Sequence, residues 1–530
     1  MEVISVNKQT KPKPTMRKTR FLKLLGVIVT LGFITGCAKD NIVLIDPINS
    51  ENDDIVNTEF TQTVYVAYSL TENASVTGTN EDFMVAVNGN EVTVVYSGEE
   101  YVMYELSGYT NDGFFKLYST KKQGITLNEV NITNPNGAAI NVQGTLSEPS
   151  KGKCTFVVIN GGNALRDGEI YSDAPTGEDE KATLFSEGQL IFSGNGTLTV
   201  GAFGKSGIAS DDYIVIQSGN INVSVPASAY YDSEDAEYKS PAAVKANDYF
   251  SMKGGNLIIS SSGTGSKGIS CDGNGYFRGG SVSVTVSGSN YGSGGWSGSS
   301  SNNRSAKGMK FDGNLFFSGS QVYVNCRNHE GIEAKGALTI SGGEIYSSSI
   351  ADDAINSGGD FTISGGYVCG YSSGNDGLDA NGDFYIKGGV VYAIGARSPE
   401  VAVDANSEGG RKLYLTGGTL IAIGGLENGS SLTQSCYSVS SWSANTWYAL
   451  TVGSETYAFM TPTSGGTPLV VSGASAPTLQ SGVTVSGGTS HFEAMLYTGA
   501  SVNGGSSVSL SAYTGGNGGG PGGGGGHGPF

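Results

Sequence analysis

The sequence predicts an all-β protein, specifically a right-handed parallel β-helix (solenoid) with β-rich N- and C-terminal caps. The first observation is a repeat, in which a small or acidic turn precedes an apolar anchor, a short strand, a turn rich in glycine and a second strand. The anchors are Leu184, Ile208, Val244, Ile269, Met309, Ile332, Ile355, Leu378 and Val403, and the three intervals from Met309 to Leu378 are each 23 residues long. A fixed period near this length is typical of stacked repeat units.

The second observation is the spacing of apolar residues within each unit. Leu338 and Ile340 stand six and eight positions after the anchor Ile332, and Ile345 stands thirteen positions after it. A spacing of two indicates a strand with one buried face, and the glycine pair between the two strands permits a sharp turn. No unit has room for a helix of ordinary length. We therefore expect one coil per repeat, rising ~4.8 Å, and right-handed by analogy with most parallel crossovers.

Composition supports this fold class and limits the partners. Glycine accounts for 83 of 530 residues, and charged residues make up only 15%. The chain is therefore too apolar for general disorder and too rich in glycine for a helical protein. A net charge of −18 argues against a nucleic-acid partner, which requires a basic surface. We expect a monomer.

Residues 1–37 predict a lipoprotein signal peptide. A basic segment precedes the apolar stretch from Leu24 to Phe33, which is too short to span a bilayer and ends at Ile34-Thr35-Gly36-Cys37. This end resembles a bacterial lipobox, with Cys37 as the lipidated first residue of the mature protein. We therefore predict a chain that is lipid-anchored in the bacterial outer membrane or at the cell surface.

The remaining chain divides according to the repeat. Residues 38–60 are acidic and patternless and predict a tether. Residues 61–183 predict an N-terminal cap with irregular first coils, residues 184–424 the regular coils, and residues 425–514 a β-rich C-terminal cap over the open end. Residues 515–530 are mostly glycine and predict a disordered tail.

Several strings resemble a known family. They are GIASDDYIVIQSGNINV from Gly207, GLDANGDFYIKGGVVYAIG from Gly377, GTLTV from Gly196 and INGGNALRDG from Ile159. In these strings the chain resembles the bacterial carbohydrate-binding domain-containing β-helix proteins over about residues 61–510. The resemblance implies a fold similar to pectate lyases, binding of cellulose and acidic plant polysaccharides, and bound calcium. It rests on a repeat and not on a catalytic signature.

Acidic residues recur two positions before and one position after successive anchors, where stacking superimposes them. The candidate metal ligands are Glu330, Glu333, Asp353, Asp376, Asp379 and Asp404 at these positions, together with Asp352 beside Asp353. Carboxylates one coil apart would be ~5 Å from one another and would repel strongly unless a cation neutralised them. Ca²⁺ suits because it accepts many oxygen ligands in flexible geometry. The alternative is that these are solvated turn residues, which are often Asp or Asn.

Aromatic residues form two columns that the alternation turns outward. The candidate carbohydrate-binding residues are Tyr323, Tyr346 and Tyr392 in one column, Tyr276, Phe316, Tyr385 and Tyr414 in the other, and Trp296 in the insertion from Ser287 to Ala306. Flat rings can stack on the apolar faces of sugars. The alternative is that these rings only cover the sheet.

We therefore predict a calcium-dependent polysaccharide-binding surface lipoprotein, held to the membrane at Cys37, that binds a cellulose-like or acidic glycan without catalysis. The first alternative is a calcium-dependent lyase of the pectate type, in which Lys267, Lys307 or Lys310 acts as the base. Lysines beside carboxylates are normally held in the charged form, which is wrong for a base. The second alternative is a passive surface adhesin or structural protein.

Overall fold

The computed structural model describes residues 55–172, 178–233, 235–292 and 303–515. The chain divides into residues 1–51, none of which is among those described, and residues 52–530, which hold every element below. Over the described ranges, regular structure consists of β-strands and one 3₁₀ turn, η1 (Ile55–Asn57). The predicted all-β fold is confirmed. No helix in these ranges is long and apolar enough to cross a membrane.

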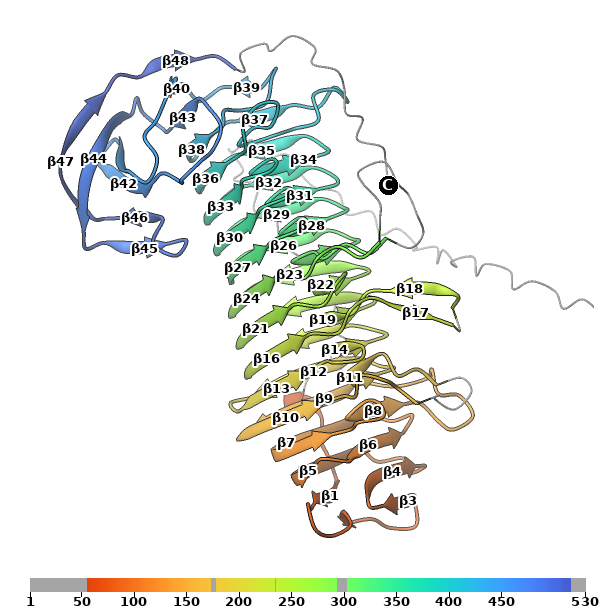
Figure 1. Ribbon diagram of the computed structural model, residues 1–530. Coiled ribbons are helices and arrows are strands. Elements are labelled where there is room, and N and C mark those ends of the chain that lie inside the picture. The colour runs from red at the N-terminus through yellow and green to blue at the C-terminus, as the bar shows by residue number, and fades with distance from the viewer. Residues whose placement is uncertain (1–54, 173–177, 234, 293–302, 516–530) are drawn as a thin grey trace, which may run out of the picture. The chain divides into compact units, whose positions relative to one another are not determined.

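Most strands belong to two long sheets (Figure 1). In the described ranges one sheet has 12 strands: β3 (Phe83–Asn88), β4 (Asn90–Tyr96), β6 (Gly113–Tyr118), β8 (Ile140–Gln143), β11 (Ala182–Ser186), β14 (Ser206–Ser210), β19 (Ala242–Ala246), β22 (Lys267–Cys271), β25 (Met309–Phe311), β28 (Ile332–Ala334), β31 (Ile355–Ser357) and β34 (Leu378–Ala380). From β4 onward its neighbours pair in parallel, and β3 pairs with β4 antiparallel.

The larger sheet has 28 strands within the described part of the chain. They are β1 (Gln62–Tyr68), β2 (Ser75–Thr77), β5 (Val102–Thr110), β7 (Gln123–Thr133), β9 (Thr155–Asn160), β10 (Gly162–Arg166), β12 (Leu190–Gly194), β13 (Thr197–Gly201), β15 (Ile214–Ile216), β16 (Asn220–Val225), β20 (Tyr249–Met252), β21 (Asn256–Ser261), β23 (Asn274–Phe277), β24 (Ser281–Val286), β26 (Leu315–Phe317), β27 (Gln321–Cys326), β29 (Leu338–Ile340), β30 (Glu344–Ser349), β32 (Phe361–Ile363), β33 (Tyr367–Ser372), β35 (Phe384–Ile386), β36 (Val390–Ile394), β37 (Leu413–Leu415), β38 (Thr419–Ile423), β39 (Ser431–Leu432), β40 (Cys436–Val439), β43 (Leu469–Ser472) and β48 (Ser511–Tyr513).

The register between repeats follows the anchors. Met309 pairs with Ile332, Ile332 with Ile355 and Ile355 with Leu378, and isolated bridges continue this row to Val403 and Leu426. Each anchor in this row is almost completely buried, in a continuous apolar core between the two sheets. Between the two strands of a repeat, Gly343 and Gly366 adopt φ of 91° and 81°, which a side chain would oppose. A one-residue slip would turn the core-facing residues outward, so the repeat fixes the register.

The C-terminal part adds a separate sheet of six strands among the described residues: β41 (Trp447–Val452), β42 (Glu455–Met460), β44 (Thr478–Ser486), β45 (Thr489–His491), β46 (Leu496–Thr498) and β47 (Ser501–Val508). Its buried face forms a second apolar cluster with the outward face of β30, β33, β36 and β38, in which Tyr392 packs against Phe459. The C-terminal sheet therefore covers part of the large sheet.

The insertion from Pro226 to Pro241 forms a hairpin of β17 (Tyr230–Asp232) and β18 (Glu237–Lys239). The second insertion contacts it, because the Arg304 Nε donates to the Tyr238 carbonyl at 2.6 Å and the Tyr238 and Tyr291 rings lie 5.2 Å apart. The described residues of the two insertions therefore contact each other, and the hairpin of β17 and β18 lies beside β19 and β22 (Figure 1).

Candidate functional site

Five carboxylates gather at the C-terminal end of the 12-stranded sheet, and we call them the acidic group: Asp353, Asp376, Asp379, Asp404 and Glu427. Asp376 and Asp379 flank the start of β34, and backbone bonds continue the rows to Asp404 and Glu427. Carboxylate oxygens of Asp376, Asp379 and Asp404 all lie within 4.8 Å of one another. Asp353 contacts this set, because its Oδ1 accepts a hydrogen bond from the Asp376 amide at 3.2 Å.

Burial makes the acidic group electrostatically costly. Desolvation, with added repulsion from neighbouring carboxylates, raises the pKa of Asp353, Asp376 and Asp379 well above the ordinary value. Burial, together with a contact to Asp404, raises the pKa of Glu427 to about 8. A cation would relieve this repulsion, and a set made only of oxygen donors fits a hard ion such as Ca²⁺ better than a transition metal. The role of these residues as metal ligands stays a prediction.

The other predicted metal ligands, Glu330, Glu333 and Asp352, lie in a different environment, where a lysine and a histidine already contact them. Lys307 Nζ lies 3.2 Å from Glu330 Oε1 and 2.6 Å from Glu333 Oε2. His329 contacts Glu330 and lies 2.9 Å from Asp352. Burial would raise the pKa of Asp352, but hydrogen bonding and charge from His329 outweigh it and lower the pKa. The structure therefore divides the predicted strip in two.

The same rows carry cations on the preceding repeats, and we call these the lysine group: Lys245, Lys267, Lys307 and Lys310. Lys310 lies 2.7 Å from Asp312, and Lys307 has its two glutamates. Among the described residues Lys267 makes no ion pair, although it is only 8% exposed. Burial and then repulsion by Lys310, Lys307, Lys245 and Arg304 lower the pKa of Lys267 to about 7. The expectation that neighbouring carboxylates hold every lysine of this strip charged is wrong for Lys267, because the groups around it are cations.

One acidic cluster was missed by the sequence reasoning. Oxygens of Asp179, Glu187 and Asp211 lie within 4.8 Å of one another, and Lys181 Nζ lies 2.8 Å from Asp179 and 2.5 Å from Asp211. Burial and the nearby aspartates raise the pKa of Glu187 to about 8. Glu187 and Asp211 follow paired strands at equivalent positions, a signal that the sequence contained. Asp179 lies outside the repeat, so its approach could not be read from spacing.

The structure corrects the predicted exposure of four tyrosines. Tyr346 and Tyr392 are 6% and 0% exposed, because the C-terminal sheet covers their column. Tyr323 is half-buried at the margin of this cover, and its hydroxyl donates to Glu344 at 2.5 Å. Tyr276 is 7% exposed, because Phe316 stacks on it at 5.3 Å and Tyr249 packs against its edge. Alternation gave the outward direction correctly but could not reveal what lies above it.

A second outward column retains accessible rings, and we call it the tyrosine face: Phe316, Thr339, Thr362, Tyr385 and Tyr414. These residues pair in register on β26, β29, β32, β35 and β37, and all are half-buried. The rings of Tyr385 and Tyr414 are nearly parallel, with centroids 5.1 Å apart. Lys387 Nζ lies 5.1 Å from the Tyr385 centroid. The column therefore presents two aromatic ends joined by threonine hydroxyls.

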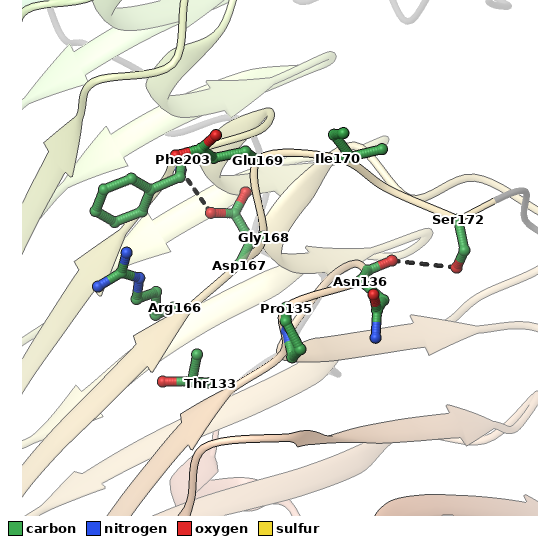
Figure 2. Close-up of a pocket in the computed structure, with 10 residues that line it drawn as sticks. All are labelled: Thr133, Pro135, Asn136, Arg166, Asp167, Gly168, Glu169, Ile170, Ser172 and Phe203. Atoms are coloured by element: carbon green, nitrogen blue, oxygen red, sulfur yellow. Dashed lines mark hydrogen bonds between the residues drawn. The ribbon is translucent and has the colours of Figure 1, made fainter.

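A cavity of about 590 Å³ lies beside the end of β10 (Figure 2). The Asp167 carboxylate accepts hydrogen bonds from the backbone amides of Phe203, Gly204 and Lys205 and from the Tyr171 hydroxyl, and so fixes the wall of the cavity. The Arg166 guanidinium lies 3.9 Å from the Phe203 ring centroid. Arg166 and Asp167 belong to the string INGGNALRDG, but its spacing alone gave them no role. The arrangement offers a cation and an aromatic edge to a ligand.

Some predicted residues lie elsewhere. Cys37, the signal peptide of residues 1–37, most of the tether, Trp296 and nearly all of the glycine-rich tail fall outside the described residues. The other five cysteines, Cys154, Cys271, Cys326, Cys369 and Cys436, form no disulfide among the described residues and are buried, as small apolar residues often are.

Comparison with known proteins finds similarity to carbohydrate-binding domain-containing proteins. A family model described as carbohydrate-binding domain-containing protein matches residues 88–377. A carbohydrate-binding domain-containing protein of Acetivibrio thermocellus is 31% identical over 156 residues, which are 29% of this chain and 51% of that protein. The chain thus spans about half the length of this curated relative. A solved structure of a polysaccharide lyase-like protein from C. thermocellum, a gadolinium derivative, has 17% identity and a TM-score of 0.36, covering 61% of this chain and 96% of its own.

Proposed function

Because the chain belongs to the carbohydrate-binding domain-containing protein family, whose model matches residues 88–377, we propose that it binds a polysaccharide without altering it. The family match is the observation that carries this proposal. The match contains the cavity at Arg166 and the first three members of the tyrosine face, Phe316, Thr339 and Thr362. We also infer that its repeats wind as a right-handed parallel β-helix, which the parallel pairing at a constant 23-residue step supports.

The tyrosine face is the surface that we assign to a neutral chain such as cellulose. Sugar rings have apolar faces that stack on aromatic side chains, and the threonine hydroxyls between the two aromatic ends can hydrogen-bond to sugar hydroxyls. Successive residues of the face lie one strand spacing apart, ~4.8 Å. A rigid sheet holds them in place, so that binding requires little ordering of the protein.

The cavity at Arg166 is the surface that we assign to an acidic sugar. A guanidinium binds a carboxylate through two parallel hydrogen bonds. Asp167, next to Arg166 in the sequence, is 1% exposed and accepts hydrogen bonds from three amides and a hydroxyl. Glu169, which also lines the cavity, is exposed and adds a negative charge to it. Arg166 is exposed and is oriented by Phe203, so a uronate carboxylate can approach it from solvent.

Calcium is the cofactor that we propose for the acidic group. Asp376, Asp379 and Asp404 would hold the ion, which would neutralise the carboxylates of Asp376 and Asp379, whose pKa is raised. An ion there stabilises the last repeats before the C-terminal sheet. We further propose that Cys37 carries the lipid that anchors the chain to the bacterial outer membrane or cell surface, because the sequence before it ends in a lipobox-like string.

The direct test is depletion of the full chain from solution by insoluble cellulose and by a calcium-gelled polygalacturonate, each with calcium and with chelator. We expect the chain to bind both polymers, and we expect chelation to weaken its binding to polygalacturonate. A chain that stays in the supernatant with every polymer would contradict the proposal. A passive adhesin differs from this proposal because it would keep its binding when Tyr385 and Tyr414 are both changed to alanine.

One observation favours a lyase as a second candidate, the lowered pKa of Lys267. A neutral lysine at pH 7 could remove the α-proton of a uronate held by calcium. However, Lys267 lies four repeats before Asp376, and four strand spacings amount to ~19 Å. A sugar held by the acidic group cannot reach it. Ultraviolet absorbance from unsaturated uronides, formed by wild type and lost in Lys267→Met, would establish the lyase.

A further inference from the structure

A second cavity lies where the C-terminal sheet ends on the large sheet. Its volume is about 350 Å³, and it is lined by Ser283 of β24, Tyr323 of β27 and residues 490–493, which run from β45 into the following turn. Figure 1 shows the β45 and β46 hairpin at this edge of the stack. Three of the lining residues, Ser283, Ser490 and Glu493, are exposed, and His491 is 5% exposed. The cavity is therefore open on one side and built on a buried polar base.

Hydrogen bonds fix the base of this cavity. Glu344 accepts from the Tyr323 hydroxyl at 2.5 Å and from the Phe492 amide at 3.0 Å, and its other oxygen lies 3.0 Å from His491 Nδ1. The His491 ring also stacks on Tyr367 with centroids 3.8 Å apart. Burial would raise the pKa of Glu344, but these hydrogen bonds outweigh it and lower the pKa. Glu344 therefore acts as an ionised brace between the large sheet and the C-terminal sheet.

The turn that forms the wall has an unusual backbone. Phe492, Glu493 and Ala494 adopt positive φ angles of 55°, 54° and 69°. Each such conformation is unfavourable for a non-glycine residue, and it persists only where surrounding contacts determine it. Here the buried Phe492 and the bond to Glu344 hold the turn. The wall is therefore kept in one shape before any ligand arrives.

The column of Tyr323 is blocked on one side of the cavity. Moving away from the C-terminal sheet, the column continues through Ser283 and Ile258, which are exposed. Moving toward that sheet, it passes through Tyr346, Cys369 and Tyr392, which are buried beneath it. A chain lying along this column must therefore end at the cavity.

We propose that this cavity, lined by Ser283, Tyr323, Ser490, His491 and Glu493, binds the terminal unit of a neutral glycan chain. Tyr323 supplies the aromatic surface, and the two serines supply hydroxyls for hydrogen bonds. The carboxylates of Glu493 at the rim and Glu344 at the base disfavour an acidic sugar by repulsion. Residues 490–493 lie outside the matched segment 88–377, so this site goes beyond the surfaces proposed above, although it rests on the same function of glycan binding.

The test is calorimetric titration of the full chain with a neutral cello-oligosaccharide and with an oligogalacturonate. Ser490→Trp fills the cavity from an exposed position and leaves the Glu344 brace intact. Thr478→Trp, at an exposed position on β44 of the same sheet that does not line the cavity, is the matched control. We expect Ser490→Trp to weaken the stronger of the neutral-ligand binding events at least tenfold, Thr478→Trp to leave it unchanged, and the acidic ligand to be unaffected by either.

Wild-type affinity for the neutral oligosaccharide in Ser490→Trp would overturn this inference. If Tyr385→Ala/Tyr414→Ala then abolished binding, the proposed function would stand and the cavity would not be a glycan site. Preference of the cavity for the acidic ligand, seen as loss of that ligand in Ser490→Trp, would also overturn it. Wild-type protein that binds no glycan would instead refute the proposed function itself.

Discussion

The acidic group and the lysine group occupy the same two rows of one sheet and carry opposite charges. In both, burial opposes ionisation, so the pKa of Asp376 and Asp379 rises while that of Lys267 falls. Where the two groups adjoin, Lys307 of the lysine group forms ion pairs with Glu330 and Glu333, so that these charges neutralise one another. The repeat therefore sets where side chains meet, while residue identity decides whether the protein neutralises their charges itself or needs an outside ion.

The largest effect expected from this comparison concerns Lys267. Its pKa is about 7 in the folded chain against 10.5 ordinarily, so the charged form destabilises the fold at low pH, and the cost disappears as pH rises from 7 toward 10.5. Lys267→Met should therefore raise unfolding free energy at pH 6 by on the order of 3 to 5 kcal/mol more than at pH 10. Denaturant titration at both pH values measures the difference. Exposed Lys412→Met is the control, and an equal effect of Lys267→Met at both pH values would break the comparison.

The acidic group should respond to calcium where the lysine group does not. Calcium at about 100 times its Kd should stabilise the fold by about 2.7 kcal/mol, and Asp376→Asn/Asp379→Asn should remove most of this gain. Thermal unfolding with and without chelator provides the measurement. Asp112→Asn, an exposed aspartate in a turn far along the chain from these rows, should keep the full gain. A calcium gain that survives in the double variant would place the ion elsewhere.

A smaller effect concerns pH in the absence of calcium. The raised pKa of Glu427, about 8, means that the folded chain holds a proton more tightly than the unfolded chain. Stability should therefore be present at low pH and lost as pH rises from about 4.5 to 8. In Glu427→Gln the free energy of unfolding should decrease by about 1 to 2 kcal/mol less over this pH range than in wild type. Melting temperatures at pH 5 and pH 8 in chelator would sharpen the comparison, and a melting temperature that rises over this range would contradict it.

The smallest expected effect separates the two ligand surfaces. Arg166→Gln removes one charge-assisted contact and should weaken polygalacturonate binding about tenfold without changing cellulose binding. Co-sedimentation with each polymer measures both. Arg411 is exposed and lies near Asp383. The control Arg411→Gln tests whether the loss of any positive charge weakens polygalacturonate binding equally.

The repeat made much of the fold and part of the site predictable. Met309, Ile332, Ile355 and Leu378 pair as their spacing requires, and the same spacing brings Asp376 near Asp379 and Asp404. The sequence could not show that Tyr346 and Tyr392 are buried, because their cover comes from strands far along the chain, as in the bond from Phe492 to Glu344. It also could not show the environment of Lys267, because Arg304 reaches it from an insertion outside the repeat. Periodicity predicts neighbours on successive repeats, and contacts made by non-repeating segments escape it.

The tyrosine face provides the most direct test of polysaccharide binding. Each aromatic contact contributes about 0.5 to 1.5 kcal/mol beyond its buried area, so Tyr385→Ala/Tyr414→Ala should weaken binding of insoluble cellulose at least tenfold. Tyr109→Ala, a ring that is 52% exposed on β5, should bind as wild type does. Depletion isotherms of the three proteins, each shown to be folded by its melting curve, give the answer. A folded double variant with the wild-type isotherm would contradict the account.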